Sequence, residues 1–338
     1  MAAATTNTSG PSEPLTLTPI LLEKVWGGDR LAAFGKAIEP GQTIGESWEL
    51  ADLTATTASG AGGGAFRSIV SSGTYAGKSI GDLIASHQSA MLGNAQPSPE
   101  GGFPLLVKFL DATDDLSVQV HPSPAYCKLD PTAKLKTECW YILAAEPGAV
   151  IYKGIKPGVT AQQFAAHIAD GTVVNDLIAV PAIAGDCHNL PSGTVHALGR
   201  GALVAEVQTP SDTSFRVFDW GRVGRELHIE QALKCIEFAP APLPTRSPPL
   251  ASHRRLVRND YFVLTEYRAS AEQCQLPSTE PNHPLVIIVL DGTITLETPN
   301  GATATLTKGQ TCLLPACIAA DTRIINGPAK AHWLQARV

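Results

Sequence analysis

Four side chains with metal-binding donor atoms stand out. Gln119 and His121 lie two residues apart in DLSVQVHPSPAY, Glu138 lies in LKTECW, and His196 lies in LPSGTVHAL. Residues two apart in a β-strand point to the same face, so Gln119 and His121 can address one point. Two imidazoles, a carboxylate and an amide oxygen suit Zn²⁺ and are tolerable for other divalent transition ions. Singly, each residue has an ordinary explanation in packing or surface charge, so the hypothesis depends on all four together.

Short β-strands are expected to position these side chains. Short apolar or β-branched runs alternate with 30 glycines and 26 prolines, without regular alternation of strand and helix. Three helices are expected, at Ile80–Leu92, Thr160–Asp170 and Ile229–Ile236, and the second begins with a Thr160/Gln163 capping box. We therefore predict a mainly β fold of antiparallel sandwiches or barrels with a few short helices.

A proline-rich stretch divides the chain. Five prolines fall between Ala239 and Pro249, a composition typical of a stiff extended linker. We expect a flexible tail at 1–14, a first domain with small helical insertions at 15–238, the linker at 239–250 and a second β domain at 251–338. The spacing Gly-x5-Pro occurs in both parts, from Gly185 and from Gly309. This suggests a duplicated β unit, although two unrelated turns would give the same pattern.

The charge and cysteine patterns bound the class of protein. The 338 residues include 25 basic and 31 acidic ones, a net charge of −6 without clusters of like charge, so nothing indicates nucleic acid or an anionic membrane as a partner. No segment approaches the roughly 18 to 20 consecutive apolar residues of a membrane span, and residues 1–14 lack the features of a secretory signal. The seven scattered cysteines form no C-x-x-C pair. We expect reduced thiols and a cytoplasmic location.

The segment around His196 has a more specific pattern. Gly185-x5-Pro191-x-Gly193-x2-His196 has the spacing of the second cupin motif, which turns a barrel strand so that its histidine points inward. From about residue 15 to about residue 237, the sequence resembles type I phosphomannose isomerases (mannose-6-phosphate isomerases) of the short bacterial form. The segments that carry the resemblance are LTLTPILLEKVWGGDRLAAFGK, IGESWELAD, FPLLVKFLDATDDLSVQVHPSPAY, LKTECWYIL, LPSGTVHALGRGALVAEVQTPSDTSFRVFDWGR and ELHIEQAL.

The resemblance implies a fold and a cofactor. The expected fold is a bicupin, two antiparallel jelly-roll barrels, with one Zn²⁺ per chain in the first, catalytic barrel. The implied ligands are the residues at positions Gln119, His121, Glu138 and His196. Gln119 stands where the first cupin motif often has histidine, and Glu138 follows His121 by 17 residues instead of a few. Both departures are features of this family.

The resemblance also implies a reaction, the interconversion of mannose 6-phosphate and fructose 6-phosphate through a cis-enediol. A metal can polarise the substrate oxygens, and a base moves the carbon-bound proton. Arg216, in SFRVFD, is the first choice for stabilising an enediolate or phosphate oxygen, and the alternative is a structural ion pair with Asp212 or Asp219. Lys136, two residues before Glu138, is either an acid/base group or a phosphate contact.

Three more charged residues are candidates for the pocket. Lys108 is the only charge in FPLLVKFL, and a buried ammonium is costly unless paired, so we predict that it binds substrate; a lysine at a sheet edge is the competing interpretation. Glu206 in LVAEVQ and Asp212 in TPSDTS join Lys136 and Arg216 as catalytic candidates. Which of them takes the carbon-bound proton is open.

Other functions also stay open at this point. An isomerase of another, unphosphorylated sugar would share the metal and the base, a sugar-sensing bicupin would have lost the chemistry, and a cupin oxygenase would use iron. The expected partner is a small phosphosugar, with no nucleic acid or membrane, and the chain is expected to be a monomer or homodimer. Five residues after Pro315 the sequence has Ala320 where the first unit has His196. The second unit is therefore expected to be free of metal.

Overall fold

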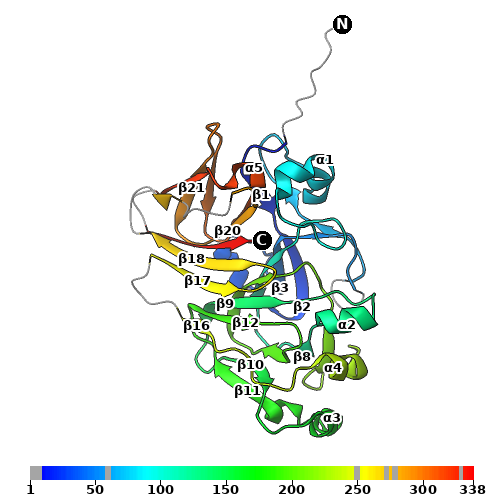
Figure 1. Cartoon of the computed structure of the whole chain (residues 1–338). Coiled ribbons are helices and arrows are strands. Elements are labelled where there is room, and N and C mark those ends of the chain that lie inside the picture. The colour runs from blue at the N-terminus through cyan, green and yellow to red at the C-terminus, as the bar shows by residue number, and fades with distance from the viewer. Residues whose placement is uncertain (1–9, 58–61, 247–251, 270–273, 276–280, 327–329) are drawn as a thin grey trace.

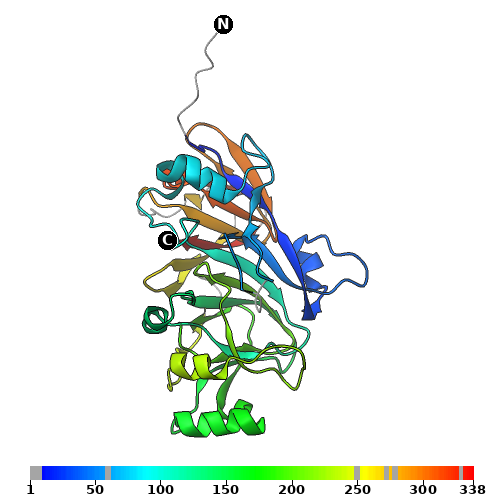
Figure 2. The same ribbon diagram turned by 90° about the vertical axis from the view of Figure 1, so that its right-hand side faces the viewer.

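The computed structural model describes residues 10–57, 62–246, 252–269, 274–275, 281–326 and 330–338. In these ranges the chain forms four main antiparallel sheets, stacked as successive layers, with the helices at the periphery (Figures 1 and 2). The mainly β prediction is confirmed. None of these sheets closes on itself in the described ranges, so closed jelly-roll barrels are not confirmed.

Sheets 1 and 2 come from the first part of the chain. Sheet 1 has the order β11 (Leu177–Pro181), β10 (Val150–Ile155), β13 (His196–Leu198), β8 (Val118–Val120) and β15 (Phe215–Phe218). Sheet 2 has the order β16 (Thr245–Arg246), β12 (Asp186–Leu190), β9 (Glu138–Ala145), β14 (Ala202–Gln208), β7 (Leu106–Asp111), β3 (Ile44–Leu50) and β2 (Ile20–Gly28). A small hairpin pairs β4 (Asp52–Leu53) with β5 (Phe66–Arg67).

Sheets 3 and 4 come mostly from the last part of the chain. Sheet 3 has the order β17 (His253–Arg258), β18 (Val263–Ala269), β25 (Ala331–Arg337), β20 (Leu285–Asp291), β23 (Thr311–Leu314), β1 (Leu15–Thr18) and β6 (Ile69–Val70). Sheet 4 has the order β19 (Cys274–Gln275), β24 (Arg323–Asn326), β21 (Thr293–Glu297) and β22 (Thr303–Thr307). Because β1 and β6 join sheet 3, the start of the chain is built into the second unit.

The two pairs of sheets repeat one topology. In sheet 2, β12-β9-β14-β7-β3 are neighbours in that order, and in sheet 3 the order is β23-β20-β25-β18-β17. The strands correspond one to one: β3 with β17, β7 with β18, β9 with β20, β12 with β23 and β14 with β25. Each set of five therefore follows the same order along the chain and the same order across its sheet. The order β11-β10-β13-β8 in sheet 1 likewise corresponds to β22-β21-β24-β19 in sheet 4. These strand orders agree with the predicted duplication.

Apolar side chains fill the space between successive layers. Trp140 of sheet 2 and Leu198 of sheet 1 belong to one core, and Ile287 of sheet 3 and Leu296 of sheet 4 belong to another. The largest core joins sheets 2 and 3. The two units therefore bury a shared hydrophobic face, which is the dominant source of their association.

Each expected helix is present. The helices are α1 (Ile80–Leu92), α2 (Pro124–Leu129), α3 (Ala161–Asp170), α4 (Ile229–Cys235) and α5 (Ala316–Ala319), with 3₁₀ turns at Arg30–Phe34 and Val173–Asp176. The predicted capping box at the start of α3 is formed, since Thr160 accepts from the Gln163 N–H and the Gln163 side chain accepts from Thr160. None of the helices in the described ranges is long and apolar enough to cross a membrane.

The proline-rich stretch is extended up to the point where its described part ends. Ile155 donates to the carbonyl of Ala239, and β16 pairs with β12. This part therefore lies along the first unit. Residues 247–250 of the predicted linker lie outside the described residues, and the domain division stays a prediction.

Candidate metal centre and active-site cavity

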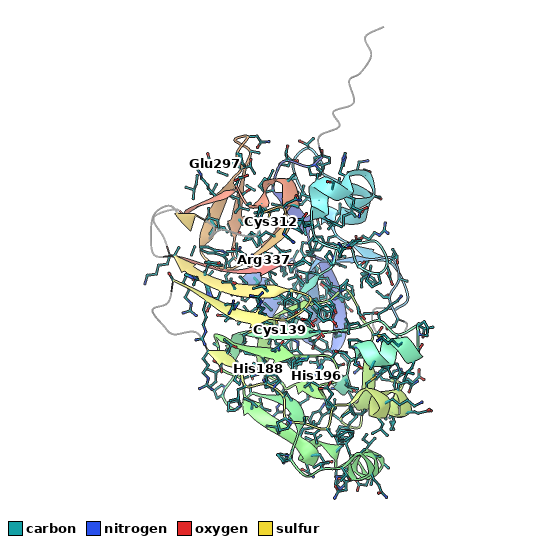
Figure 3. All side chains as sticks on the ribbon, in the orientation of Figure 1. Cys139, His188, His196, Glu297, Cys312 and Arg337 are labelled. Carbon is teal, nitrogen blue, oxygen red and sulfur yellow. The ribbon has the colours of Figure 1, made fainter. Side chains whose placement is uncertain are left out.

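Three strands bring the predicted metal-binding residues together. Gln119 lies on β8 directly opposite His196 of β13, and His121 directly follows β8. Glu138 begins β9 and approaches from sheet 2. Figure 3 shows His196 in the half of the molecule formed by sheets 1 and 2. The predicted set is therefore drawn from both layers of one sandwich.

The donor atoms converge on a small region. Nε2 of His121 lies 3.4 Å from Oε2 of Glu138, and Nε2 of His196 lies 3.2 Å from Oε1 of the same carboxylate. The donor atoms of these three residues all lie within 4.8 Å of one another, and all three side chains are buried. This cluster could hold a metal ion.

Backbone hydrogen bonds orient both imidazoles. Nδ1 of His121 lies 3.1 Å from the carbonyl oxygen of Thr213, and Nδ1 of His196 lies 2.9 Å from that of Thr194. A carbonyl can only accept, so each Nδ1 carries the proton and each Nε2 presents its lone pair. A metal-bound histidine typically donates its other ring N–H to a backbone carbonyl in this way.

The buried donor atoms also lack enough partners within the protein. Nε2 of His121 and both carboxylate oxygens of Glu138 are buried and form no hydrogen bond with the described residues, although Nζ of Lys136 pairs with Oε2 at 2.9 Å. Unpaired buried polar atoms of this kind are costly, and a divalent cation would satisfy all three. The chemistry of the set therefore fits a metal.

The protonation states are suited to coordination. Burial, and after it the charge of Lys136, lowers the pKa of His121 to about 3. Burial acts to raise the pKa of Glu138, but Lys136 and His121 outweigh it and the pKa lies well below its usual range. Neutral imidazole and ionised carboxylate are the forms that bind metal.

Gln119 lies beside this cluster. Its Nε2 is 3.4 Å from Nε2 of His196. Turning the amide by 180° exchanges its nitrogen and oxygen and directs Oε1 to the same place. Gln119 is thus positioned to provide a fourth donor.

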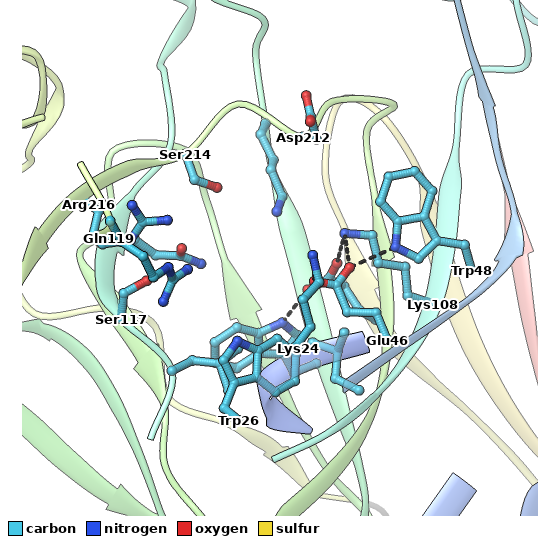
Figure 4. Close-up of a pocket in the computed structure, with 16 residues that line it drawn as sticks. Lys24, Trp26, Glu46, Trp48, Lys108, Ser117, Gln119, Asp212, Ser214 and Arg216 are labelled. Atoms are coloured by element: carbon cyan, nitrogen blue, oxygen red, sulfur yellow. Dashed lines mark hydrogen bonds and ion pairs between the residues drawn. The ribbon is translucent and has the colours of Figure 1, made fainter. Parts of the chain in front are cut away.

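A cavity opens beside the cluster (Figure 4). Arg216, Gln119 and Ser117 lie on one side of it, and Lys108 and Trp48 lie on the other. All five predicted catalytic and substrate-binding residues line it: Lys108, Lys136, Glu206, Asp212 and Arg216. The structure therefore gathers them around one space, next to the candidate metal centre.

Lys108 and Glu206 form a buried network across neighbouring strands. They are register partners on β7 and β14, and Nζ of Lys108 lies 3.4 Å from Glu206 and 3.4 Å from Glu46. Burial and, after it, the negative charge of Glu138 raise the pKa of Glu206. Burial acts to lower the pKa of Lys108, but the negative charges of Glu46 and Glu206 outweigh it and raise the pKa above its usual range. Lys108 is therefore a paired, charged residue inside the pocket.

Arg216 forms no ion pair with Asp212 or with Asp219, the two partners considered for a structural role. Its Nη1 donates to the carbonyl oxygen of Glu226, at 2.6 Å, and its buried Nε has no hydrogen-bond partner among the described residues. Asp219 instead pairs with Arg222 and Arg225. Arg216 also lies opposite Gln119 in the β15–β8 register. Its guanidinium therefore lies beside the candidate metal centre with a donor to spare.

Sequence reasoning missed one wall of the cavity. Lys24, Glu46 and Trp48 of β2 and β3 line it, and Arg225 lines it from the loop after β15. Lys24 lies 3.3 Å from Glu46, whose Oε2 accepts from the indole of Trp48 at 2.7 Å. Burial acts to raise the pKa of Glu46, but Lys108 and Lys24 outweigh it and lower it to about 2. The sequence feature that could have identified this wall was the presence of charged residues within the strand segments LLEKVWGG and IGESWEL.

The second unit has no equivalent cluster in its described part. Glu138 pairs with Leu190, the residue before Pro191, whereas Leu285 pairs with Leu314, the residue before Pro315. Leu285 thus occupies the place that corresponds to Glu138 and lies in an apolar core.

Sequence comparison points to one family. Residues 15–138 match the family model described as "Phosphomannose isomerase type I, catalytic domain". The chain is 35% identical over 317 residues to the mannose-6-phosphate isomerase of Streptococcus mutans, covering 90% of this chain and 93% of that protein. It is also 38% identical over 237 residues to the mannose-6-phosphate isomerase ManA of Bacillus subtilis, covering 68% of this chain and 70% of that one.

Solved structures have the same fold. The mannose 6-phosphate isomerase from Bacillus subtilis superimposes with a TM-score of 0.82 at 29% identity, over 96% of this chain and 100% of that chain. A variant of phosphomannose isomerase from Salmonella typhimurium gives a TM-score of 0.75 at 15% identity, over 96% and 99% of the two chains. At that identity the second likeness concerns the fold alone.

Proposed function

The chain belongs to the type I phosphomannose isomerase family and is a mannose-6-phosphate isomerase, and from this premise we propose a zinc-dependent reaction that passes through a cis-enediol. The convergence of Gln119, His121, Glu138 and His196 beside the cavity carries the proposal. A reaction of this class moves one proton between C1 and C2 and another between their oxygens. The chain must therefore supply a base and hold the developing negative charge.

We propose one Zn²⁺ per chain, held by these four residues. The mixed nitrogen and oxygen donor set, the oriented imidazoles and the buried carboxylate oxygens, which accept no hydrogen bond from the described residues, support the assignment. When bound, the ion supplies Lewis acidity toward substrate oxygens. Lys136 lies 2.9 Å from Oε2 of Glu138 and limits the negative charge of that side of the cavity.

Glu206 is our candidate for the base. Its Oε2 is fixed by the indole N–H of Trp140 at 2.7 Å, while its buried Oε1 accepts no hydrogen bond from the described residues and lies 3.4 Å from Nζ of Lys108. One oxygen is thus held and the other is available for a proton. The raised pKa brings the carboxyl group closer to the pH at which proton transfer is efficient. Asp212, in contrast, accepts two hydrogen bonds from Thr57 with Oδ2.

Two cations complete the proposed machinery. Lys136 lies between the candidate metal centre and the cavity, where its ammonium can donate to a substrate oxygen. Arg216 offers its unpartnered Nε to an enediolate or phosphate oxygen. Lys108 holds Glu206 from the other side at 3.4 Å and so fixes the position of the proposed base.

This assignment is tested by the rate at which the Glu206→Gln variant converts mannose 6-phosphate to fructose 6-phosphate. We expect kcat to fall by about 100-fold or more, because the amide cannot take the proton, with zinc content unchanged. Glu230→Gln is the matched control: it lies on α4, its side chain is 81% exposed, and it pairs with Lys234 on the surface. Wild-type kcat in Glu206→Gln would exclude Glu206 and leave Lys136 or Asp212 as the base.

A further inference from the structure

The charges along the cavity are unevenly balanced. On the side of β2 and β3, Lys24 lies 3.3 Å from Glu46, and Lys108 lies 3.4 Å from both Glu46 and Glu206. Two ammonium groups therefore face two carboxylates. We call these four residues the lysine end of the cavity. A phosphate dianion placed there would lie against two carboxylates, which is electrostatically unfavourable.

The opposite side carries a surplus of positive charge. Asp219 accepts from both Arg222, at 2.8 Å, and Arg225, at 3.0 Å, and Arg222 also pairs with Asp114. Arg216 donates to a carbonyl and forms no ion pair in the part of the chain that the structure describes. Three guanidinium groups therefore face two carboxylates. We call Arg216, Arg222 and Arg225, together with Asp114 and Asp219, the arginine end.

The two loop arginines differ in how many of their donors are used. Arg222 donates through Nε and Nη2 to Asp219, through Nη1 to Asp114 and through Nη2 to the carbonyl oxygen of Asp115. Among the described residues, Arg225 donates through Nη1 alone, to the two oxygens of Asp219 at 3.0 and 3.1 Å. Its Nε and Nη2 stay available, and Arg225, unlike Arg222, lines the cavity.

The loop after β15 presents Arg225 to the cavity. Trp220 anchors its start, because the indole N–H donates to the carbonyl oxygen of Leu116 at 2.7 Å. Gly221 and Gly224 both have left-handed backbone conformations, with φ of 81° and 84°, which turn the chain back. Asp219 is buried and holds the Arg225 guanidinium from one edge. The guanidinium is therefore partly preorganised, with its other edge unused.

We propose that Arg225, together with Arg216, binds the phosphate group of the substrate, and that the lysine end receives the sugar hydroxyls. This inference rests on the proposed function. A guanidinium fork matches phosphate oxygens, and the hydroxyls of Ser117 and Ser214 line the same cavity and can donate. The carboxylates of the lysine end accept from hydroxyl groups. The phosphate thus fixes which end of the sugar reaches the candidate metal centre.

Binding of sorbitol 6-phosphate and of sorbitol to the zinc-loaded full-length protein tests the proposal by calorimetry. Neither compound has a carbonyl group to isomerise, so the measurement does not depend on turnover, and only one carries a phosphate. In Arg225→Gln we expect the Kd of sorbitol 6-phosphate to rise by about tenfold or more, the typical effect of losing a charged hydrogen bond. Arg225→Lys should recover part of the affinity. Kd for sorbitol should stay within about twofold.

Arg258→Gln is the charge-matched control, because Arg258 is an exposed residue of β17 that does not line the cavity. It should bind sorbitol 6-phosphate as the wild type does. An unchanged Kd in Arg225→Gln, a larger effect in Lys24→Gln, or no saturable binding to the wild type would each overturn the proposal. A failure of the proposed isomerase function would appear separately, as wild-type protein that binds sorbitol 6-phosphate and forms no fructose 6-phosphate.

Discussion

Nζ of Lys136 lies 2.9 Å from Oε2 of Glu138, with both side chains buried beside the cavity. The two residues are separated by one position in the sequence, and they join the candidate metal centre to the substrate space. A buried charge without a partner is strongly unfavourable. The carboxylate can therefore stay ionised in the protein before the metal binds.

Lys136→Met should lower kcat by about 100-fold or more while zinc still binds. The substitution removes a donor from the cavity but keeps all four proposed metal ligands. Steady-state formation of fructose 6-phosphate, together with metal analysis, checks this prediction. Wild-type kcat with full zinc content would show that the ammonium acts only as a counter-ion to Glu138.

Gln119→Leu should weaken zinc binding and lower kcat/KM by about 10-fold to 100-fold. Leucine has a similar volume but no oxygen, so the centre would keep three protein donors. Competition with a chelator measures the zinc affinity. If zinc affinity and activity both stayed at wild-type values, Gln119 would have only a packing role.

Lys36→Met should lower the free energy of unfolding by about 3 to 5 kcal/mol. Nζ of Lys36 donates at 2.7 Å to Glu49 and at 2.7 Å to the carbonyl oxygen of Gly309, and so links the two units. Without the ammonium, the buried Glu49 carboxylate loses its counter-ion and keeps only the Ser47 hydroxyl as a donor among the described residues. Urea denaturation of Lys36→Met and of the double variant Lys36→Met/Glu49→Gln checks this prediction. The double variant should recover much of the loss, and equal stability of the two proteins would contradict the account.

His188 should make stability fall in acid. It is fully buried, neither ring nitrogen has a hydrogen-bond partner among the described residues, and burial, then Lys153 and Arg246, lower its pKa from 6.5 to about 3. Between these values the unfolded chain binds a proton that the folded chain does not. Stability therefore declines from about pH 6.5 toward pH 3, by up to about 1.4 kcal/mol per pH unit.

The comparison of wild type with His188→Phe isolates this contribution. The slope of unfolding free energy against pH should be smaller for His188→Phe between about pH 6.5 and pH 4, measured by urea denaturation with chelator present in both samples. The chelator removes metal loss as a cause of acid sensitivity. Parallel curves over this range would contradict the assignment to His188.

Local patterns in the sequence predicted the three longest of the five α-helices in the described ranges, and the elements of the candidate centre. The Gln119/His121 spacing needs only the strand period, and the α3 capping box needs only four consecutive residues. Closed barrels, in contrast, followed from the resemblance, and the described sheets are open. Sheet closure depends on strand pairing at the edges, which no local pattern encodes.

Long-range pairing is what the sequence did not reveal. Lys36 meets Gly309 across 273 positions of the chain, and Lys24 and Lys108 both reach Glu46 because β2 and β7 pair with β3 on either side. Nothing in the spacing of these residues indicates such contacts. Arg225 was missed for another reason, because its place in the cavity depends on the course of a loop anchored by Trp220.

Zinc content and isomerase activity measured together test the central claim most directly. We predict one zinc per chain in the purified protein, formation of fructose 6-phosphate from mannose 6-phosphate, and loss of both in His121→Ala/His196→Ala and after treatment with a chelator. Renewed zinc should restore the chelated wild type and leave the double variant inactive. Full activity in a metal-free His121→Ala/His196→Ala protein would contradict the account.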